Sequence, residues 1–317
     1  MRVFILTALA MIAFASNSLL CRAALKQTTI DPATFTFVRI FSGAIVLVVV
    51  VGIRESLITK NSLPSPQSSP DGRGGPFSLR EKVGMRAGDW ISAVSLFVYA
   101  AGFSFAYVGL SAGTGALLLF GAVQATMILW GFRRGERLDA AEIAGILIAL
   151  IGLVVLVFPG ISAPPLIASI FMLAAGVAWG AYSLRGRTAA NATAATTGNF
   201  LRAVPFGALI SVIAFKQMRF DSLGICCAVV SGAITSGLGY VIWYSALAGL
   251  KAVSAATVQL SVPVLAATGG ILLLHEPITL RYVIASIAVL GGILLVVIEK
   301  QRTSLPPQTM SGSEDQQ

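Results

Sequence analysis

The sequence has few charged residues, one histidine and three cysteines. Only 11% of its 317 residues are charged and 56% are hydrophobic, whereas a soluble domain carries about 25% charge. A chain with so little charge cannot hide this much apolar surface from water, so most of its solvent must be lipid. The single histidine, His275, has no convergent partners for a catalytic or metal site, and we interpret it as a surface residue.

The cysteines exclude further chemistry. Cys21, Cys226 and Cys227 all lie inside apolar runs, which argues against a disulfide framework and against a zinc site. We therefore predict no metal, no cofactor and no catalytic residues. An enzyme embedded in the membrane and acting on lipid would need Asp, His, Ser or Cys gathered near one interface. The lone histidine and the lack of acids within the apolar runs argue against such an enzyme.

Nucleic acid is not an expected partner, despite the net charge of +9. The lysines and arginines are concentrated in short loops between apolar runs and form no continuous basic stripe. The expected partners are the lipid bilayer and a small-molecule substrate, and a homodimer is left open.

Ten apolar runs are long enough to cross a bilayer, which takes about 20 residues. We expect a helix in each run, because lipid offers no partner for free backbone N–H and C=O groups. The first run resembles a signal peptide but is longer than a typical cleaved one, so we expect it to be retained. The predicted spans cover residues 3–25, 33–53, 89–109, 112–132, 140–158, 166–185, 198–216, 222–246, 252–274 and 280–298.

Two stretches outside the spans have the composition of disordered chain. Residues 54–88 hold four prolines among serine, glycine and charged residues, and residues 299–317 form a polar tail of similar character. We predict that both are disordered and cytoplasmic, and that neither carries chemistry.

The basic residues predict the orientation. With the N-terminus in the cytoplasm, fifteen of the 22 lysines and arginines fall in cytoplasmic segments and five in external ones. The remaining two, Arg39 and Arg202, lie inside spans. Because cytoplasmic loops are rich in Lys and Arg, both termini are predicted to be cytoplasmic, in a multi-pass protein of the cell's inner (plasma) membrane.

A block of about fifty residues occurs twice, from Ala106 to Phe158 and from Ala246 to Ile298, without a gap. The shift is 140 residues, and Glu136 falls on Glu276. Earlier in the halves the shift is 163, and the long loop absorbs the difference. Each half, residues 1–158 and residues 166–298, therefore has five spans. Because five is odd, the second half enters the membrane inverted, an arrangement typical of secondary transporters.

Several positions in both halves resemble the EamA-type permeases of the drug/metabolite transporter superfamily. In the first half they are Asn17, Arg22, Pro32 and Arg39. In the second half they are Ala246-Leu247, Ala255-Ala256, Pro263, Glu276-Pro277 and Gly291-Gly292. The first half departs from the pattern at Val123, which stands where the second half has Pro263. The resemblance implies a ten-helix carrier in the inner membrane that moves small metabolites, often outward.

Arg39 and Arg202 are the charged candidates for a substrate site. Charges inside a bilayer are costly and therefore informative, and these two arginines occupy equivalent positions in the halves. Two cations facing a central cavity could bind a carboxylate or phosphate through forked hydrogen bonds. The alternative is that each side chain reaches back to its own membrane surface.

The uncharged candidates are polar or aromatic residues within spans. Asn17, Gln124 and Gln259 could orient a substrate or form hydrogen bonds between helices. Trp179, Tyr240 and Trp243 could line a cavity, or they could serve packing and the interfacial aromatic belts. The sequence leaves both readings open.

Glu136 and Glu276 are retained by the repeat, and each precedes the last helix of its half. A carboxylate near a helix start can accept from free N–H groups and interact with the helix dipole, so a structural role is favoured over a gating ion pair.

These observations favour a secondary transporter (a permease or exporter) of a small polar metabolite, working by alternating access between the halves. The thirteen Asp and Glu residues lie at span ends, in loops or in the tail, so a carboxylate-bearing solute such as an amino acid is favoured over a cation. The alternatives are a multidrug or cation efflux carrier of the same superfamily and a membrane scaffold without transport.

Overall fold

The computed structural model describes residues 2–61, 87–135, 139–160, 163–187, 189, 191–247, 249–250 and 258–303, and within these ranges it contains helices and turns but no strand. The elements are α1 (Arg2–Gln27), α2 (Pro32–Asn61), α4 (Trp90–Tyr107), α5 (Ala112–Arg133), α6 (Ala140–Val157), α7 (Leu166–Gly186), α8 (Ala192–Ile213), η1 (Phe215–Gln217), α9 (Ser222–Val230), η2 (Ser231–Leu238), α10 (Gly239–Leu247), α12 (Ser261–Leu274) and α13 (Leu280–Thr303).

The helices have the length and composition of membrane spans. In the described ranges, nine helical stretches are long and apolar enough to cross a bilayer, with Ser222–Leu247 counted as one stretch. The shorter α12 is also apolar, and the beginning of its predicted span, residues 252–257, lies outside the described residues. The prediction of an all-α integral membrane protein is confirmed.

Three predicted boundaries were wrong. α2 continues to Asn61 and α13 to Thr303, so residues 54–61 and 299–303 are helical instead of disordered. Both extensions contain Arg, Glu and Lys, which favour helix and end a hydrophobic run without ending the helix. The rest of each stretch, residues 62–86 and 304–317, lies outside the described residues.

The third boundary is the start of α8, which lies at Ala192, six residues before the predicted span. Asn191 caps this helix, because its side chain accepts a hydrogen bond from the Ala194 N–H at 3.0 Å. Residues 192–197 are alanine and threonine, which are too polar to be recognised as part of an apolar run. A capped helix can therefore begin before its hydrophobic section does.

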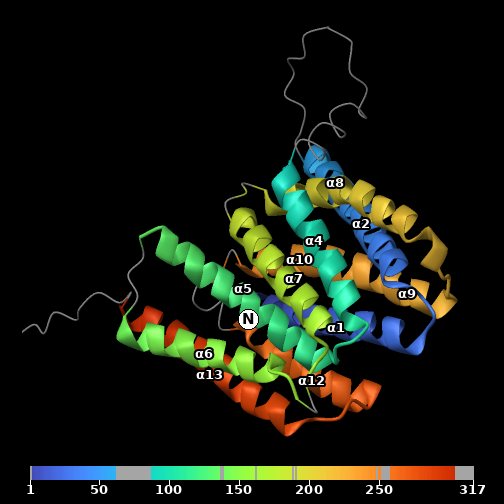
Figure 1. Ribbon diagram of the computed structural model, residues 1–317. Coiled ribbons are helices and arrows are strands. Elements are labelled where there is room, and N and C mark those ends of the chain that lie inside the picture. Colours follow the sequence, from blue (N-terminus) through green and yellow to red (C-terminus); the bar gives the residue numbers. More distant parts are fainter. Residues whose placement is uncertain are drawn as a thin grey trace, which may run out of the picture.

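The helices pack in pairs (Figure 1). α6 and α13 lie side by side at one edge of the bundle, α2 packs against α8, and α5 against α12. α4 packs against α7, while α1 packs against the continuous stretch from α9 to α10. The outer faces carry exposed apolar side chains such as Ile151 and Ile287, at 61% and 69% exposure, as expected where lipid is the solvent.

The middle of the eighth predicted span is a π-helix, η2, between two α-helical segments. π-Helical segments are rare in proteins, and those that occur are often found at functional sites. η2 packs against both α1 and α2, and an added Cβ on its Gly232 would clash with the Arg39 carbonyl oxygen of α2. The absence of a side chain at Gly232 therefore lets the π-helix approach the backbone beside Arg39.

Candidate functional site

Arg39 lies at the centre of the bundle and is only 2% exposed. Its Nη2 donates to the Tyr99 hydroxyl at 2.9 Å, and its Nε donates to Ser236 Oγ at 3.2 Å. The guanidinium carbon also lies 5.1 Å from the Tyr99 ring centroid and 4.8 Å from that of Phe103, within the range of cation–π attraction. Arg39 therefore does not reach back to the membrane surface.

Asn17 joins three helices beside this arginine. Its Oδ1 accepts from Ser231 Oγ at 2.6 Å and from Thr235 Oγ1 at 3.2 Å, both on η2. Its Nδ2 donates to the Tyr99 hydroxyl at 3.3 Å. Tyr99 thus links Asn17 of α1 with Arg39 of α2, and the π-helix supplies hydroxyl groups to both.

Aromatic rings surround this polar group. Trp179 lies at the centre of the cluster, with its ring 4.8 Å from Tyr99 and 4.9 Å from Tyr240. Phe14 contacts Trp179, Tyr240 and Trp243 edge to face, at centroid distances of 6.1, 6.0 and 5.9 Å. Edge-to-face pairs at these distances are favourable. The rings form an apolar wall around a site whose polar atoms come from four helical stretches.

The charge of Arg39 has no carboxylate partner among the described residues. The two ion pairs in those ranges are Arg22–Glu276 and Arg185–Asp89. Nη1 of Arg39 and the Tyr240 hydroxyl are both buried and have no hydrogen-bond partner in the described part of the chain. Buried polar groups are usually paired, so these two donors are available to a bound molecule.

The structure brings five predicted site residues together: Asn17, Arg39, Trp179, Tyr240 and Trp243. It does not place Arg202 with them. Nη1 of Arg202 donates to the backbone oxygens of Ala87 and Gly198, at 3.1 and 3.0 Å, and its guanidinium lies 5.9 Å from the Trp90 ring centroid, at the start of α4. The expected pair of arginines is therefore not assembled in this structure.

Gln124 and Gln259 are both buried, at 3% and 6% exposure. Gln124 lies on α5, and Gln259 lies just before α12. Each makes polar contacts within the protein. Their place in a substrate site stays a prediction.

Sequence reasoning missed Tyr99, Phe103, Phe14 and the hydroxyl residues of η2. Tyr99 carries the strongest signal in retrospect, because a tyrosine in the middle of an apolar span must find a partner for its hydroxyl group. The apolar runs are nearly uniform, so their hydrophobic pattern did not show which face of α4 points inward.

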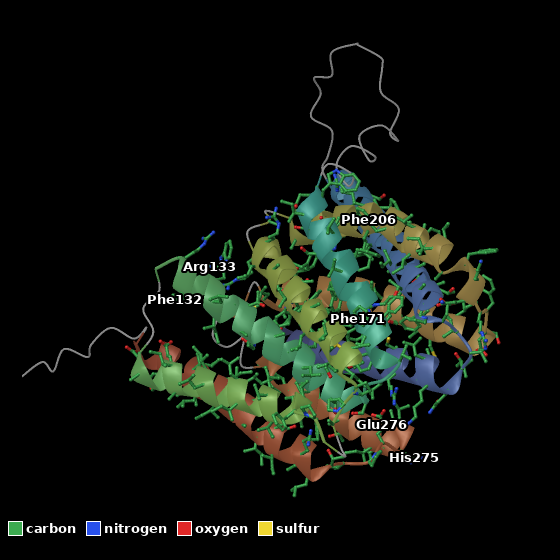
Figure 2. The ribbon with its side chains drawn as sticks, in the orientation of Figure 1. Phe132, Arg133, Phe171, Phe206, His275 and Glu276 are labelled. Carbon is green, nitrogen blue, oxygen red and sulfur yellow. The ribbon has the colours of Figure 1, made fainter. Side chains whose placement is uncertain are left out.

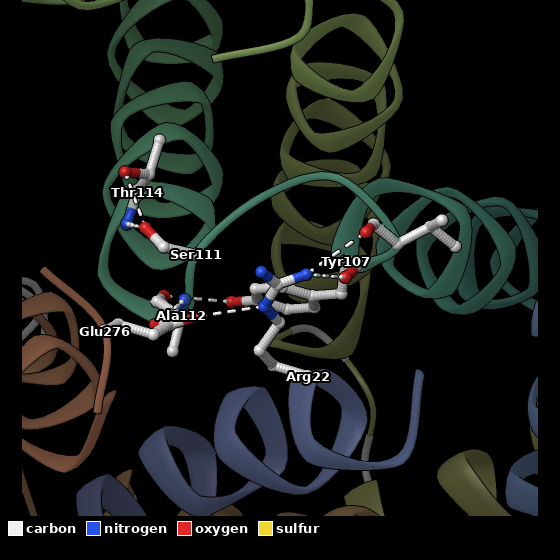
Figure 3. Close-up of polar contacts among 7 residues, drawn as sticks. Arg22, Tyr107, Ser111, Ala112, Thr114 and Glu276 are labelled. Atoms are coloured by element: carbon white, nitrogen blue, oxygen red, sulfur yellow. Dashed lines mark hydrogen bonds and ion pairs between the residues drawn. The ribbon is translucent and has the colours of Figure 1, made fainter. Parts of the chain in front are cut away.

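A second polar group lies where α1 and α4 end and α5 begins (Figure 3). Arg22 Nε donates to Glu276 Oε1 at 2.8 Å, and Arg22 Nη1 donates to the backbone oxygen of Tyr107 at 2.9 Å. Glu276 Oε2 accepts from the Ala112 N–H, the first of α5, at 2.8 Å. The predicted role of Glu276 at a helix start is therefore correct in kind but was assigned to the wrong helix.

His275 explains why Glu276 turns inward. His275 ends α12 in a left-handed conformation, with φ of 52°, and the Glu276 N–H then donates to the Gly270 oxygen at 3.0 Å. Figure 2 shows both residues at the end of the bundle opposite Arg133, the last residue of α5. His275 itself is exposed, as predicted. Glu136, the repeat equivalent of Glu276, lies outside the described residues.

The fold and its interior define the class of protein, which is a multi-pass helical bundle of the membrane with a polar, aromatic-lined interior. The EamA-like transporter family matches residues 166–298. An uncharacterized protein of Pseudomonas aeruginosa is 51% identical over 296 residues, which cover 93% of this chain and 94% of that protein. The chain belongs to the EamA-like transporter family and is a membrane transporter of the drug/metabolite transporter superfamily, which indicates transport and not catalysis.

Two more distant relatives are named as transport proteins. A probable amino-acid metabolite efflux pump of Escherichia coli is 25% identical over 206 residues, covering 60% of this chain and 68% of that protein. An uncharacterized transporter of Archaeoglobus fulgidus is 28% identical over 194 residues, covering 60% and 69%. A solved crystal structure shares the fold with a TM-score of 0.57 at 20% identity, covering 92% of this chain and 99% of that one.

Proposed function

We propose that the protein is a secondary transporter of small solutes that bear a carboxylate, including amino acids, and that Arg39 binds the carboxylate. The observation that carries this proposal is the buried Arg39 charge, which has no carboxylate partner in the described residues. A charge in this position is costly unless it is paired. A substrate anion would provide the pairing that the described residues do not.

Two donors without a partner in the described residues could each donate to a bound anion. Nη1 of Arg39 and the Tyr240 hydroxyl are both hydrogen-bond donors, and a carboxylate presents two oxygen atoms that can accept from them. The rings of Trp179 and Trp243 supply an apolar surface for the organic part of the solute. Sites for small molecules commonly combine such apolar walls with a few polar groups.

The same charge argues against the cation carrier. A cation bound at this site would face the Arg39 guanidinium with no described carboxylate beside it. The name of the E. coli relative, a probable amino-acid metabolite efflux pump, supports an amino acid or a related compound as the carboxylate-bearing solute.

We also propose that transport uses alternating access between two inverted halves in the inner membrane, with both termini in the cytoplasm. The packing supports the repeat. The repeat equivalent of α4 is the stretch from α9 to α10, and that of α7 is α1. The α4–α7 contact therefore corresponds to the contact between that stretch and α1, and both contacts are present. The pairs α2–α8, α5–α12 and α6–α13 each consist of equivalent helices. The distribution of basic residues supports the orientation.

A ligand-binding experiment with purified protein in detergent tests the proposal. The melting temperature is measured with amino acids, small carboxylates, sugar phosphates, nucleosides and lipophilic cations. A ligand at 100 times its Kd stabilises the folded state by about 2.7 kcal/mol. We expect a shift with carboxylate-bearing solutes that is lost in Arg39→Gln and retained in the control Arg202→Gln, which changes an arginine outside the cluster.

Two outcomes would contradict the proposal. Stabilisation by lipophilic cations alone would favour the multidrug carrier. An equal loss of binding in Arg39→Gln and in Arg202→Gln would remove the specific role of Arg39.

A further inference from the structure

A pocket of about 300 Å³ lies at the Arg22 end of the bundle. Its wall contains apolar residues together with Arg22, Lys26, Ser111, Thr114, Glu276 and Tyr282. Glu276 neutralises Arg22, while Lys26 has no ion-pair partner among the described residues. The pocket therefore has a net positive wall, which raises the local concentration of anions.

The Arg22–Glu276 ion pair lies in the wall of this pocket. Arg22 holds the end of α4 through the backbone oxygens of Tyr107 and Val108, at 2.9 and 3.1 Å. Glu276 holds the start of α5 through the Ala112 N–H. The two charged side chains are 12% and 6% exposed, so this contact is well shielded from water. One ion pair thus fastens α1, α4, α5 and the turn after α12 together.

A continuous series of contacts leads from this ion pair to Arg39. The Tyr107 ring is fully buried, and its centroid lies 4.7 Å from that of Phe103. Phe103 in turn lies under the Arg39 guanidinium. Gly115 of α5 leaves room for the Tyr107 ring, because an added Cβ would lie 2.7 Å from its Cζ. Tyr107 and Phe103 therefore connect the ion pair in the pocket wall with Arg39.

From this arrangement, and resting on the proposed function, we propose that the pocket is a vestibule for the carboxylate-bearing substrate. The Arg22–Glu276 ion pair is the latch that separates the vestibule from Arg39. Lys26 attracts the anion, and the route opens when α1 and the turn after α12 move apart and Tyr107 is released. Neither Arg22 nor Lys26 needs to be the final binding residue.

The opposite end of α4 carries another arginine–carboxylate contact, which is more exposed to solvent. Arg185 donates to Asp89 Oδ1 at 2.9 Å and to Ser92 Oγ at 3.0 Å, at the start of α4. Arg185 follows Arg22 by 163 residues, the shift that relates the front parts of the two halves. Repeat-equivalent arginines therefore hold the two ends of the same helix. Both contacts are present in this structure, in which Arg39 is enclosed, and transport requires that they break in turn.

Cys21 provides a native reporter for the latch. It is fully buried and directly precedes Arg22 in the sequence. A buried thiol is unreactive, so its alkylation measures opening of the route. Replacing Cys226 and Cys227 by alanine leaves Cys21 as the only cysteine of the chain.

The experiment compares the rate at which N-ethylmaleimide alkylates Cys21 in this background and in Glu276→Gln, by mass spectrometry of protein in liposomes. Glutamine retains an oxygen for the Ala112 N–H but removes the charge that holds Arg22. We expect the rate to rise about tenfold or more, within the range typical of coupled sites. Arg22→Lys, which keeps the charge but not the forked geometry, should raise it by a smaller factor.

The matched control is Asp221→Asn, which removes a carboxylate from the start of α9, at the same end of the bundle but outside the pocket. Its rate should stay within about twofold of the background, because the latch is intact. Unchanged alkylation in both Glu276→Gln and Arg22→Lys, with melting temperatures that show folded protein, would overturn the latch. Equal acceleration in the control would also overturn it, as general loosening. No substrate is needed, so this result is independent of carboxylate binding by Arg39.

Discussion

Replacing Arg39 by methionine separates a binding role from a structural one. Methionine has a similar length and no charge, so it fills the space of the arginine stem without the cost of a buried cation. Replacement of buried ionic groups by apolar residues of similar volume is often neutral or stabilising by about 1–4 kcal/mol. A residue kept for folding would instead destabilise the protein when removed.

The contacts of Arg39 set the size of the effect. Tyr99 keeps its hydrogen bond from Asn17 in the variant, whereas Ser236 Oγ loses the donor that Arg39 provides. One unsatisfied buried hydroxyl costs about 1–3 kcal/mol, which offsets part of the gain. We therefore expect the stability of Arg39→Met without ligand to lie between about 2 kcal/mol below and about 3 kcal/mol above that of the wild type.

The assay is thermal unfolding in one detergent, in which 1 kcal/mol corresponds to about 2–4 °C for chains of 150–250 residues. The expected result is a melting temperature above that of the wild type or at most about 8 °C below it, together with loss of the shift caused by carboxylate ligands. A melting temperature about 10 °C lower would mean that the hydrogen bonds and cation–π contacts of Arg39 hold the bundle together. That result would refute the argument from an uncompensated charge.

Two further predictions concern the packing and the charges around the site. Gly232→Ala should lower the melting temperature by an amount equivalent to about 1–3 kcal/mol, because the new Cβ meets the Arg39 carbonyl oxygen; an unchanged melting temperature would show that η2 can move away freely. At Asp89, burial raises the carboxyl pKa, but hydrogen bonds from Ser92 and the charge of Arg185 outweigh it, so the pKa lies below its ordinary value of 3.8. Its stabilising effect is therefore present above about pH 4 and is lost as the pH falls through the depressed pKa. Asp89→Asn should cost at most about 1 kcal/mol at pH 7, because the pair is exposed. In melts at decreasing pH, the difference from wild type should shrink once the pH is below 3.8; a difference that did not shrink with acidification would contradict the assignment.

The spans could be predicted from the sequence because lipid imposes a simple requirement on them. Every crossing must be apolar and about one membrane thickness long, and this identified runs such as residues 112–132, where α5 occupies Ala112–Arg133. The last residue of α2 and the first residue of α8 could not be predicted in the same way. Outside the bilayer, helix continuation depends on local propensity and caps such as Asn191 and not on hydropathy.

The candidate site was predictable in part. The cost of a charge in lipid indicated Arg39, and the scarcity of polar residues in the spans indicated Asn17. The role of Tyr99 depends on the rotation of α4, and the hydroxyl groups of Ser231 and Thr235 are presented by a π-helix, which has no sequence signature of its own. Arg202 shows the opposite case, because an equivalent position in a repeat does not ensure an equivalent environment.

The central claim is that Arg39 lets the protein carry a solute through its carboxylate. The most direct test is uptake into proteoliposomes of the carboxylate solute that gives the largest thermal shift, measured beside its carboxamide analogue. The account predicts saturable uptake of the carboxylate, little uptake of the amide, and loss of carboxylate uptake in Arg39→Gln with retention in Arg202→Gln. Equal uptake of the carboxylate and the amide, or full uptake in Arg39→Gln, would contradict it.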